Sequence, residues 1–176
     1  MKIANALKTA FTGLRIAYAE YKLDMTVKGN VDKEVFFHFG TQLEFNRWVA
    51  NRGQKEKYPL IWYVKDTYEE PDGCDYIEGN AKIILFTSTK QDYYNDQRIL
   101  VNYNEILHPL AKKVMDIIKY NQFIQPMNKS FQVDDIECFA GERQDFNTNK
   151  MQNVALDYLD AKVIQNKLRV YENKCN

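Results

Sequence analysis

The sequence has few of the residues that usually carry catalysis, metal binding or covalent cross-links. It contains two histidines, His38 and His108, and three cysteines, Cys74, Cys138 and Cys175, with no Cys-x-x-Cys pair. A zinc site needs clustered Cys or His ligands, and a disulfide framework needs paired cysteines. We therefore expect no metal, no cofactor and no disulfide, and a chain that folds in a reducing compartment.

The sequence also lacks the signatures of common enzyme sites and of membrane segments. It contains no Gly-x-Ser-x-Gly nucleophile elbow, no Gly-x-Gly-x-x-Gly dinucleotide loop and no phosphate-binding P-loop. No apolar run approaches the roughly 18 residues of a membrane span, and polar residues interrupt any signal-peptide core near the N-terminus. The sequence therefore predicts a protein that is not an enzyme, with neither a membrane span nor a secretion signal.

An excess of either charge is absent as well, because 24 basic residues stand against 24 acidic ones. Free-standing nucleic-acid binders normally carry a basic excess, so this balance argues against a protein that grips DNA. It does not argue against a protein that surrounds DNA. The 176 residues, 45% hydrophobic and 14% aromatic, are enough for one domain, residues 1–176, with its own core.

The spacing of apolar residues predicts an α+β fold, with a single, mostly antiparallel sheet and an N-terminal and a long helix packed on it. Three helices are expected, the last starting or kinking at Pro109: 2–22, 42–51 and 99–123. A loop that ends at Gly29-Asn30 follows the first helix. Five strands are expected, with the second and third as neighbours: 35–39, 60–65, 80–89, 130–139 and 160–171. The predicted core between sheet and long helix comprises Leu60, Trp62, Ile83, Leu85, Leu110, Val114 and Ile118.

An acidic segment, residues 66–78, joins the second and third predicted strands. Around the turn residues Pro71-Asp72-Gly73 it holds six carboxylates and no Lys or Arg: Asp66, Glu69, Glu70, Asp72, Asp75 and Glu78. Their spacing does not fit an EF-hand, which needs carboxylates at the first, third and fifth positions and Gly at the sixth. A solvated hairpin tip, a subunit or partner interface and a surface facing a DNA path all remain open. We expect the segment to project from the sheet and to touch a neighbouring subunit or face a lumen.

A second acidic group occupies the fourth predicted strand, where Asp134, Asp135 and Glu137 lie close in sequence. Alternate residues of a strand share a face, so Asp135 and Glu137 could serve a metal-dependent nuclease. No nuclease spacing is matched, and charges that guard a sheet edge explain the group more simply.

Four short motifs follow one another within residues 35–171: Phe37-His38-Phe39-Gly40-Thr41, Lys57-Tyr58-Pro59-Leu60-Ile61-Trp62, Ile84-Leu85-Phe86-Thr87-Ser88-Thr89 leading to Tyr94-Asn95-Asp96-Gln97-Arg98, and Ile106-Leu107-His108-Pro109-Leu110. Each motif is short, and their order carries the information. In that order the chain resembles the small neck proteins of tailed bacteriophages, the tail-terminator and head–tail connector group. It is most similar to neck ring proteins of crAss-like phages that infect Bacteroidetes.

The resemblance implies a tail-terminator-like structural protein of the virion neck, made in the cytoplasm of a bacterial host. Its partners would be copies of itself in a six- or twelve-fold ring and adjacent portal, neck or tail proteins. Double-stranded DNA would pass through the lumen without specific binding, and no membrane, cofactor or catalytic residue is implied. The residues themselves leave open a non-viral binding module or assembly chaperone and, less favoured, a metal-dependent nuclease.

Overall fold

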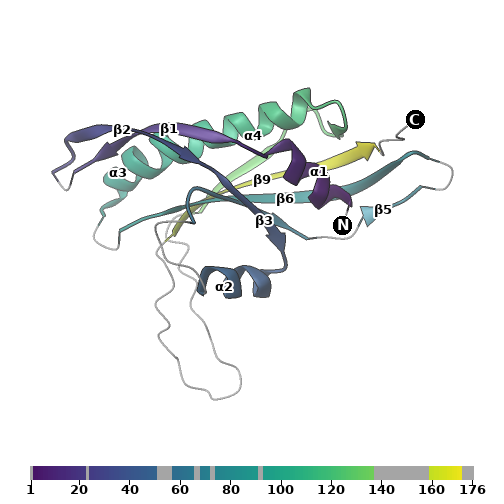
Figure 1. Cartoon of the computed structure of the whole chain (residues 1–176), viewed down its shortest axis with the longest axis horizontal. Helices are drawn as coiled ribbons and strands as arrows, with labels where there is room; N and C mark the ends of the chain where they lie inside the picture. Colours follow the sequence, from purple (N-terminus) through teal and green to yellow (C-terminus); the bar gives the residue numbers. More distant parts are fainter. Residues whose placement is uncertain are drawn as a thin grey trace, which may run out of the picture.

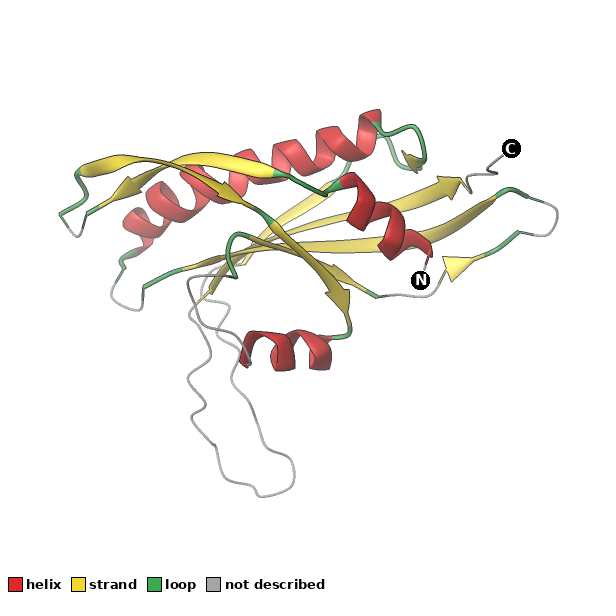
Figure 2. Ribbon diagram, viewed as in Figure 1, coloured by secondary structure: helices red, strands yellow, loops and turns green. Residues whose placement is uncertain are grey.

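Helices and strands alternate along the chain in a mixed α+β arrangement, as the sequence predicts (Figures 1 and 2). The computed structural model describes residues 2–22, 24–50, 57–65, 68–71, 74–90, 93–136 and 159–171. The helices are α1 (Lys2–Ala10), α2 (Gln42–Ala50), α3 (Asn95–Arg98) and α4 (His108–Tyr120). The strands are β1 (Arg15–Tyr21), β2 (Val27–Glu34), β3 (Phe36–Gly40), β4 (Leu60–Val64), β5 (Tyr68–Glu69), β6 (Tyr76–Ser88), β7 (Ile124–Pro126), β8 (Gln132–Ile136) and β9 (Leu159–Tyr171).

The main sheet has the strand order β3-β4-β6-β9-β7, with β5 paired to β6 and β8 paired to β9. Only β3 and β4 run parallel among these pairs; the others are antiparallel. The predicted strands correspond to β3, β4, β6, β8 and β9, and β4 and β6 are neighbours as expected. The short strands β5 and β7 escaped prediction because two or three residues carry no detectable period.

The helix predicted over 2–22 is wrong in its second half. The α-helix α1 ends at Ala10, and Gly13 then takes a left-handed backbone conformation, with φ at 73°. The strand β1 follows and pairs with β2 in a separate two-stranded ribbon, so the structure contains more than the single predicted sheet. Gly29-Asn30 lies inside β2 rather than in a loop. In β1 the alternating Ile16 and Tyr18 face the core, a spacing that also fits a helical stripe.

The long helix begins earlier than predicted and changes its geometry on the way. It runs from α3 through a π-helical segment, Ile99–Leu107, into α4. At the junction the His108 N–H donates to the carbonyl of Tyr103, five residues earlier. Pro109 directly follows the π-helical segment inside this continuous run, so the run does not start there. None of the helices in the described ranges combines the length and hydrophobicity that crossing a membrane requires.

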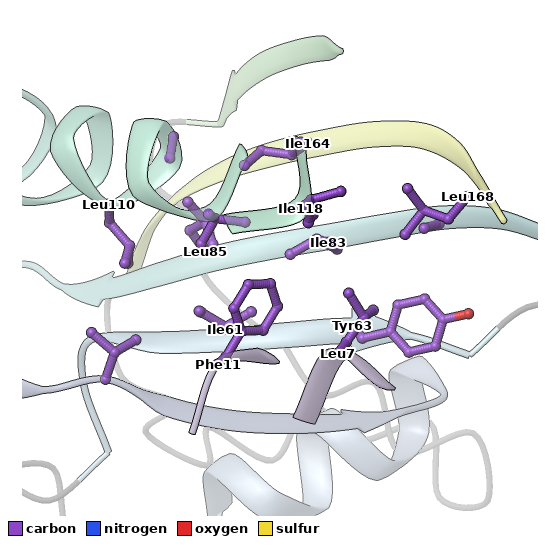
Figure 3. Packing of buried hydrophobic residues seen from close by; sticks show 14 of the residues in the cluster. Leu7, Phe11, Ile61, Tyr63, Ile83, Leu85, Leu110, Ile118, Ile164 and Leu168 are labelled. Carbon is purple, nitrogen blue, oxygen red and sulfur yellow. The ribbon is translucent and has the colours of Figure 1, made fainter. Parts of the chain in front are cut away.

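Two hydrophobic clusters lie on opposite faces of the main sheet. One joins the sheet to α1 and α4 and includes residues of β4, β6 and β9 (Figure 3): Leu7, Ile61, Tyr63, Ile83, Leu85, Leu110, Ile118 and Ile164. The other packs the reverse face against Phe45 and Val49 of α2. All seven predicted core residues are 3% exposed or less. However, Leu60 and Trp62 belong to the α2 side rather than to the long helix, because successive strand residues point to opposite faces.

Local contacts explain where α2 begins. The Thr41 side chain accepts from the Glu44 N–H at 3.3 Å, and the Glu44 carboxylate accepts from the Thr41 N–H at 2.6 Å. This capping box satisfies backbone donors at the helix start. A Cβ atom at the preceding Gly40 would lie 2.7 Å from the Glu44 carboxylate and 3.1 Å from the Trp62 ring, and the φ of 156° is one that other residues rarely adopt, so a side chain there would strain this cap.

Candidate functional site

The predicted acidic segment is split between a hairpin and the sheet. The strand β5, which ends at Glu69, pairs with β6, and the connection between them carries the exposed Asp75. The Glu70 carboxylate lies 3.1 Å from Nζ of Lys2 in α1. The remaining two predicted positions lie outside the described residues: Asp66 and Asp72. The described part of the hairpin lies at one end of the sheet (Figure 1), and the Glu70–Lys2 ion pair connects it to α1.

Glu78 does not belong to the hairpin tip, because it lies within β6. Its carboxylate accepts from Nε of Arg169 at 2.8 Å and lies 3.0 Å from Nζ of Lys167, both on β9. Hydrogen bonds from these two cations hold the pKa of Glu78 below its usual range. The Arg169 guanidinium also stacks over the Tyr76 ring, 4.2 Å from its centroid. Glu78 is thus part of a cross-strand network on the sheet surface.

The β1–β2 ribbon extends from the body and is held along one edge by the helical run (Figures 1 and 2). The Glu105 carboxylate accepts from the Ala19 N–H at 3.0 Å and from the Tyr21 hydroxyl at 3.2 Å. Lys113 donates to the Arg15 carbonyl at 3.0 Å. Eight helical residues rise about 12 Å, and four strand residues span about 13 Å. The spacing of Glu105 and Lys113 along the helical run therefore matches the spacing of their partners along β1. The two side chains satisfy backbone groups that a strand partner would otherwise use.

The outer strand of the ribbon, β2, has no such support. Every residue from Val27 to Glu34 is exposed except Val31, which is half-buried. Within the described ranges, β1 is the only strand that pairs with β2. An isolated two-stranded hairpin is marginally stable in water, so this ribbon relies on its contacts with the helical run. Its open side is the most extended unpaired backbone that the structure describes.

Replacing Glu105 with alanine should free the ribbon without unfolding the body. A hydrogen bond to a charged group contributes about 1.5–3 kcal/mol, so the Ala19 amide should exchange with solvent about 10- to 100-fold faster. Amide hydrogen exchange measured by NMR checks this. The exposed Lys112→Ala on the same helical run is the control, and it should leave the Ala19 rate unchanged. Equal Ala19 rates in Glu105→Ala and wild type would contradict the anchoring role.

A buried polar network joins the start of the helical run to the start of β9. The Arg98 guanidinium forms an ion pair with the Asp160 carboxylate, which also accepts from the Asn102 side-chain amide at 2.6 Å. Arg98, Asn102 and Asp160 are 5%, 2% and 0% exposed. A buried ion pair persists only when hydrogen bonds satisfy its members, and Asn102 does this for the carboxylate. The sequence gives one sign of this network, which is a charged residue at the head of the apolar strand 160–171.

The described residues do not bring the carboxylates of the nuclease hypothesis together on one face. On β8, Asp135 forms an ion pair with Lys162, whereas Asp134 lies on the other face and accepts from the Gln132 side chain at 3.1 Å. Glu137 lies outside the described ranges. In the part of the chain that the structure describes, no group of three or more His, Cys, Asp or Glu side chains is placed to hold a metal ion.

Both histidines pack against aromatic rings, and the one described cysteine is exposed. The ring centroids of His38 and Trp48 lie 4.7 Å apart, and those of His108 and Tyr103 lie 5.9 Å apart. Burial lowers the pKa of His108, and the nearby Lys162 acts in the same direction. Cys74 is exposed and not bonded to another cysteine. The other two cysteines lie outside the described residues: Cys138 and Cys175.

The described buried polar groups connect the helical run to the sheet. Two features stand out at the surface: the ribbon with its open strand β2, and the acidic hairpin that carries Asp75. No protein-family model and no curated protein matches this sequence.

Proposed function

We propose that the protein is a structural subunit that assembles with copies of itself into a closed ring in the neck of a tailed bacteriophage. The ring would have six or twelve copies, would lie between the portal or capsid and the tail, and would surround the DNA path. The observation that carries the assembly part of this proposal is the ribbon, because its outer strand β2 is exposed on both faces and along its open edge. Exposed strand edges are pairing surfaces that proteins cover or guard.

Large exposed apolar side chains give further support to an assembling protein. They occur at the ribbon, at the start of the helical run and beyond its end: Val27, Tyr94, Ile99, Tyr120, Phe123 and Met127. Tyr94 is 76% exposed and Tyr120 is 83% exposed. Single exposed apolar residues are common, but aromatic residues are also enriched where subunits meet. Their positions toward both ends of the helical run suit a subunit with a neighbour on each side.

The phage part of the proposal rests on the ordered motifs, whose places in the fold form one connected unit. The Phe37 motif lies in β3 and leads to α2, and the Lys57 motif leads into β4, which pairs with β3. The Ile84 motif lies in β6, the next strand of the sheet. The last motif joins the π-helical segment to α4, which packs on that sheet. The motifs therefore sample the centre of the domain rather than scattered surface loops.

The balanced charge suits a ring through which DNA slides. Phosphate contacts from Lys and Arg would hold DNA in place, and their number sets the salt dependence of binding. A pocket of about 630 Å³ lies beside β6 and β9 and is lined mainly by amide side chains, with Lys82 and Lys167. Lys167 is already paired with Glu78. This surface is polar without being a strongly basic groove.

Electron microscopy of purified phage particles, labelled with an antibody against this chain, tests the proposal. The label should appear at the junction of head and tail and nowhere else on the particle. Labelling of the capsid shell or of the distal tail would contradict the neck assignment. A chain that binds a partner in infected or uninfected cells but is absent from particles would favour the binding-module or chaperone alternative.

A further inference from the structure

The open side of the ribbon, which extends to one end of the molecule (Figure 2), presents backbone groups of β2. The Ala19 N–H and the Arg15 carbonyl bond to side chains of the helical run, so both point away from β2. The residues opposite them on β2 are Asn30 and Glu34. In an antiparallel ladder, two directly opposed residues either bond each other or both point outward, and the two kinds of pair alternate. The N–H and carbonyl groups of Asn30, Asp32 and Glu34 therefore point to the open side.

The Asp32 carbonyl is not entirely free, because it accepts from the Arg15 guanidinium at 3.0 Å. A carbonyl oxygen has two lone pairs, so one acceptor position stays open there. The edge of β2 therefore offers alternating donors and acceptors in the pattern that another strand requires.

Val31 lies at the centre of this edge, and its own backbone groups face β1. It is directly opposite Tyr18, which packs at the margin of the core. Val31 is half-buried, whereas Gly29 and Lys33, on the same face of β2, are exposed. A Cβ atom on Gly29 would meet no heavy atom of the described chain within 4 Å beyond its chain neighbours. The open side of β2 thus has one apolar side chain, with space beside it.

We propose that β2 pairs with β2 of a second copy of this chain, antiparallel and about a two-fold axis at Val31. Val31 then faces Val31 of the second copy, Asn30 faces the second copy's Asp32, and Gly29 faces the second copy's Lys33. The pairing joins two ribbons into one four-stranded sheet. An isolated two-stranded ribbon is marginally stable, and three or more strands are needed for a sheet that is stable by itself.

Backbone direction and side-chain type select this register. Asn30 and Asp32 bond across the axis, and Val31 forms a non-hydrogen-bonded pair, in which opposed side chains are closest. Tyr18 and Val31 of both copies then form one row across the four strands, and pairs of aromatic and β-branched residues stabilise a sheet. An axis at Asp32 would oppose two aspartates, and an axis at Asn30 would place Val31 against Gly29.

Charge complements the same register. Glu20 lies opposite Gly29 on β1, is exposed, and has its carboxylate 2.9 Å from Lys28 Nζ. Because Gly29 has no side chain, Lys33 of the second copy lies over it and reaches toward Glu20, and the two-fold axis makes this contact twice. Edge lysines guard a strand against indiscriminate pairing. In this arrangement Lys33 meets a carboxylate instead, so the guard does not act against a second copy.

The pairing goes beyond the proposed ring and does not depend on it. A ring closes through two different surfaces of each copy, whereas this contact uses the same surface of both copies. In a ring of twelve, it would group the copies into six pairs. Sedimentation of the free chain therefore tests the pairing, and the location of the chain in particles tests the ring separately.

Charge reversal at Lys33 and Glu20 tests the partner and the register together. The wild type should dimerise in sedimentation velocity. Lys33→Glu alone and Glu20→Lys alone should each dimerise at least about tenfold more weakly, because like charges then face each other twice across the axis. Mixed in equal amounts, the two variants should form a heterodimer about as tightly as the wild type, since every lysine then faces a glutamate. Lys112→Glu makes the same change of charge on the helical run and should dimerise like the wild type.

A cysteine at the axis gives an independent readout. A non-hydrogen-bonded pair places its Cα atoms about 4.5 Å apart, within the range of a disulfide. Val31→Cys should therefore form a disulfide between two copies under mild oxidation, identified by peptide mass spectrometry. Asn30→Cys is the control and should not, because residue 30 faces residue 32 of the second copy. The Ala19 amide should keep its slow exchange in every variant, since none of them removes Glu105.

Three results would overturn the inference. One is a wild-type chain that stays monomeric at every concentration, including a monomer whose β2 pairs only with a strand of another protein. Another is charge variants that dimerise as tightly as the wild type. The third is a disulfide that forms with a cysteine at position 30 as readily as at position 31.

Discussion

Replacing Asp160 with alanine is expected to lower the free energy of unfolding by about 3–5 kcal/mol, the cost of breaking a buried ion pair by removing one partner. The Asp160 side chain is fully buried and bonds to both Arg98 and Asn102. Its removal leaves the Arg98 guanidinium buried without this carboxylate and takes the acceptor from the Asn102 amide. The desolvation of the charge is then no longer offset. Urea denaturation followed by circular dichroism measures the loss.

A matched control lies on a neighbouring strand. Asp134 is exposed on β8 and bonds to the Gln132 side chain, so Asp134→Ala should change stability by no more than about 0.5 kcal/mol. An Asp160→Ala protein that loses less than about 1 kcal/mol would show that the network does not stabilise the fold. The expected large loss would show that the helical run is fixed to β9 through this pair. The ribbon would share that dependence, because Glu105 of the same run holds β1.

Replacing Leu85 with alanine is expected to cost about 2–5 kcal/mol, as for other large-to-small changes in a packed core. Leu85 lies in β6 between β4 and β9, is fully buried, and packs in the cluster that joins the sheet to α1 and α4 (Figure 3). The substitution removes apolar surface and leaves a cavity that flanking strands cannot fill without moving. Chemical denaturation with two-state analysis measures the change.

Leu43→Ala is the matched control for this substitution. Leu43 lies on α2 and is 55% exposed, and alanine is at least as good a helix former, so the change should cost less than about 0.5 kcal/mol. A loss below about half a kcal/mol in Leu85→Ala would place that residue outside the core. Together the two variants separate burial from the chemistry of the substitution itself.

The spacing of apolar residues predicted the central strands and the long helix correctly, because the apolar residues there are also the buried ones. The strands β4, β6 and β9 are apolar on both faces, and α4 carries one apolar stripe, so these elements could be found from sequence. The faces could not be assigned in advance: Leu60 and Trp62 pack under α2, and Ile61 and Tyr63 pack toward the long helix. Which side a helix covers depends on chain connections that a local pattern does not contain.

The first third of the chain shows where a local pattern misleads. Residues 2–22 have apolar side chains at the three- and four-residue spacing of a helix, yet β1 occupies residues 15–21. Gly13 turns the chain, and Glu105 and Lys113 form hydrogen bonds with the backbone along the edge of β1. Those partners lie about 90 residues away in sequence. The Arg98–Asp160 pair has the same character, since its members are 62 positions apart. Polar contacts between residues far apart in sequence produce no local periodic pattern that could predict them.

The acidic segment was found from composition, but its inner division was not. Glu78 belongs to β6 because the strand begins at Tyr76, earlier than the apolar run suggests, and its partners lie on β9. Glu70 forms an ion pair with Lys2 of the N-terminal helix α1. Sequence therefore predicted a charged segment, and the structure assigns Glu78 to β6, pairs Glu70 with Lys2 and leaves Asp75 exposed before β6.

The most direct test of the ring proposal is quantitative peptide mass spectrometry of purified particles, combined with averaged images of their necks. The expected result is a copy number of six or twelve per particle and a ring of matching symmetry around the DNA path at the head–tail junction. Particles that infect normally but contain no copy of this chain would contradict the proposal.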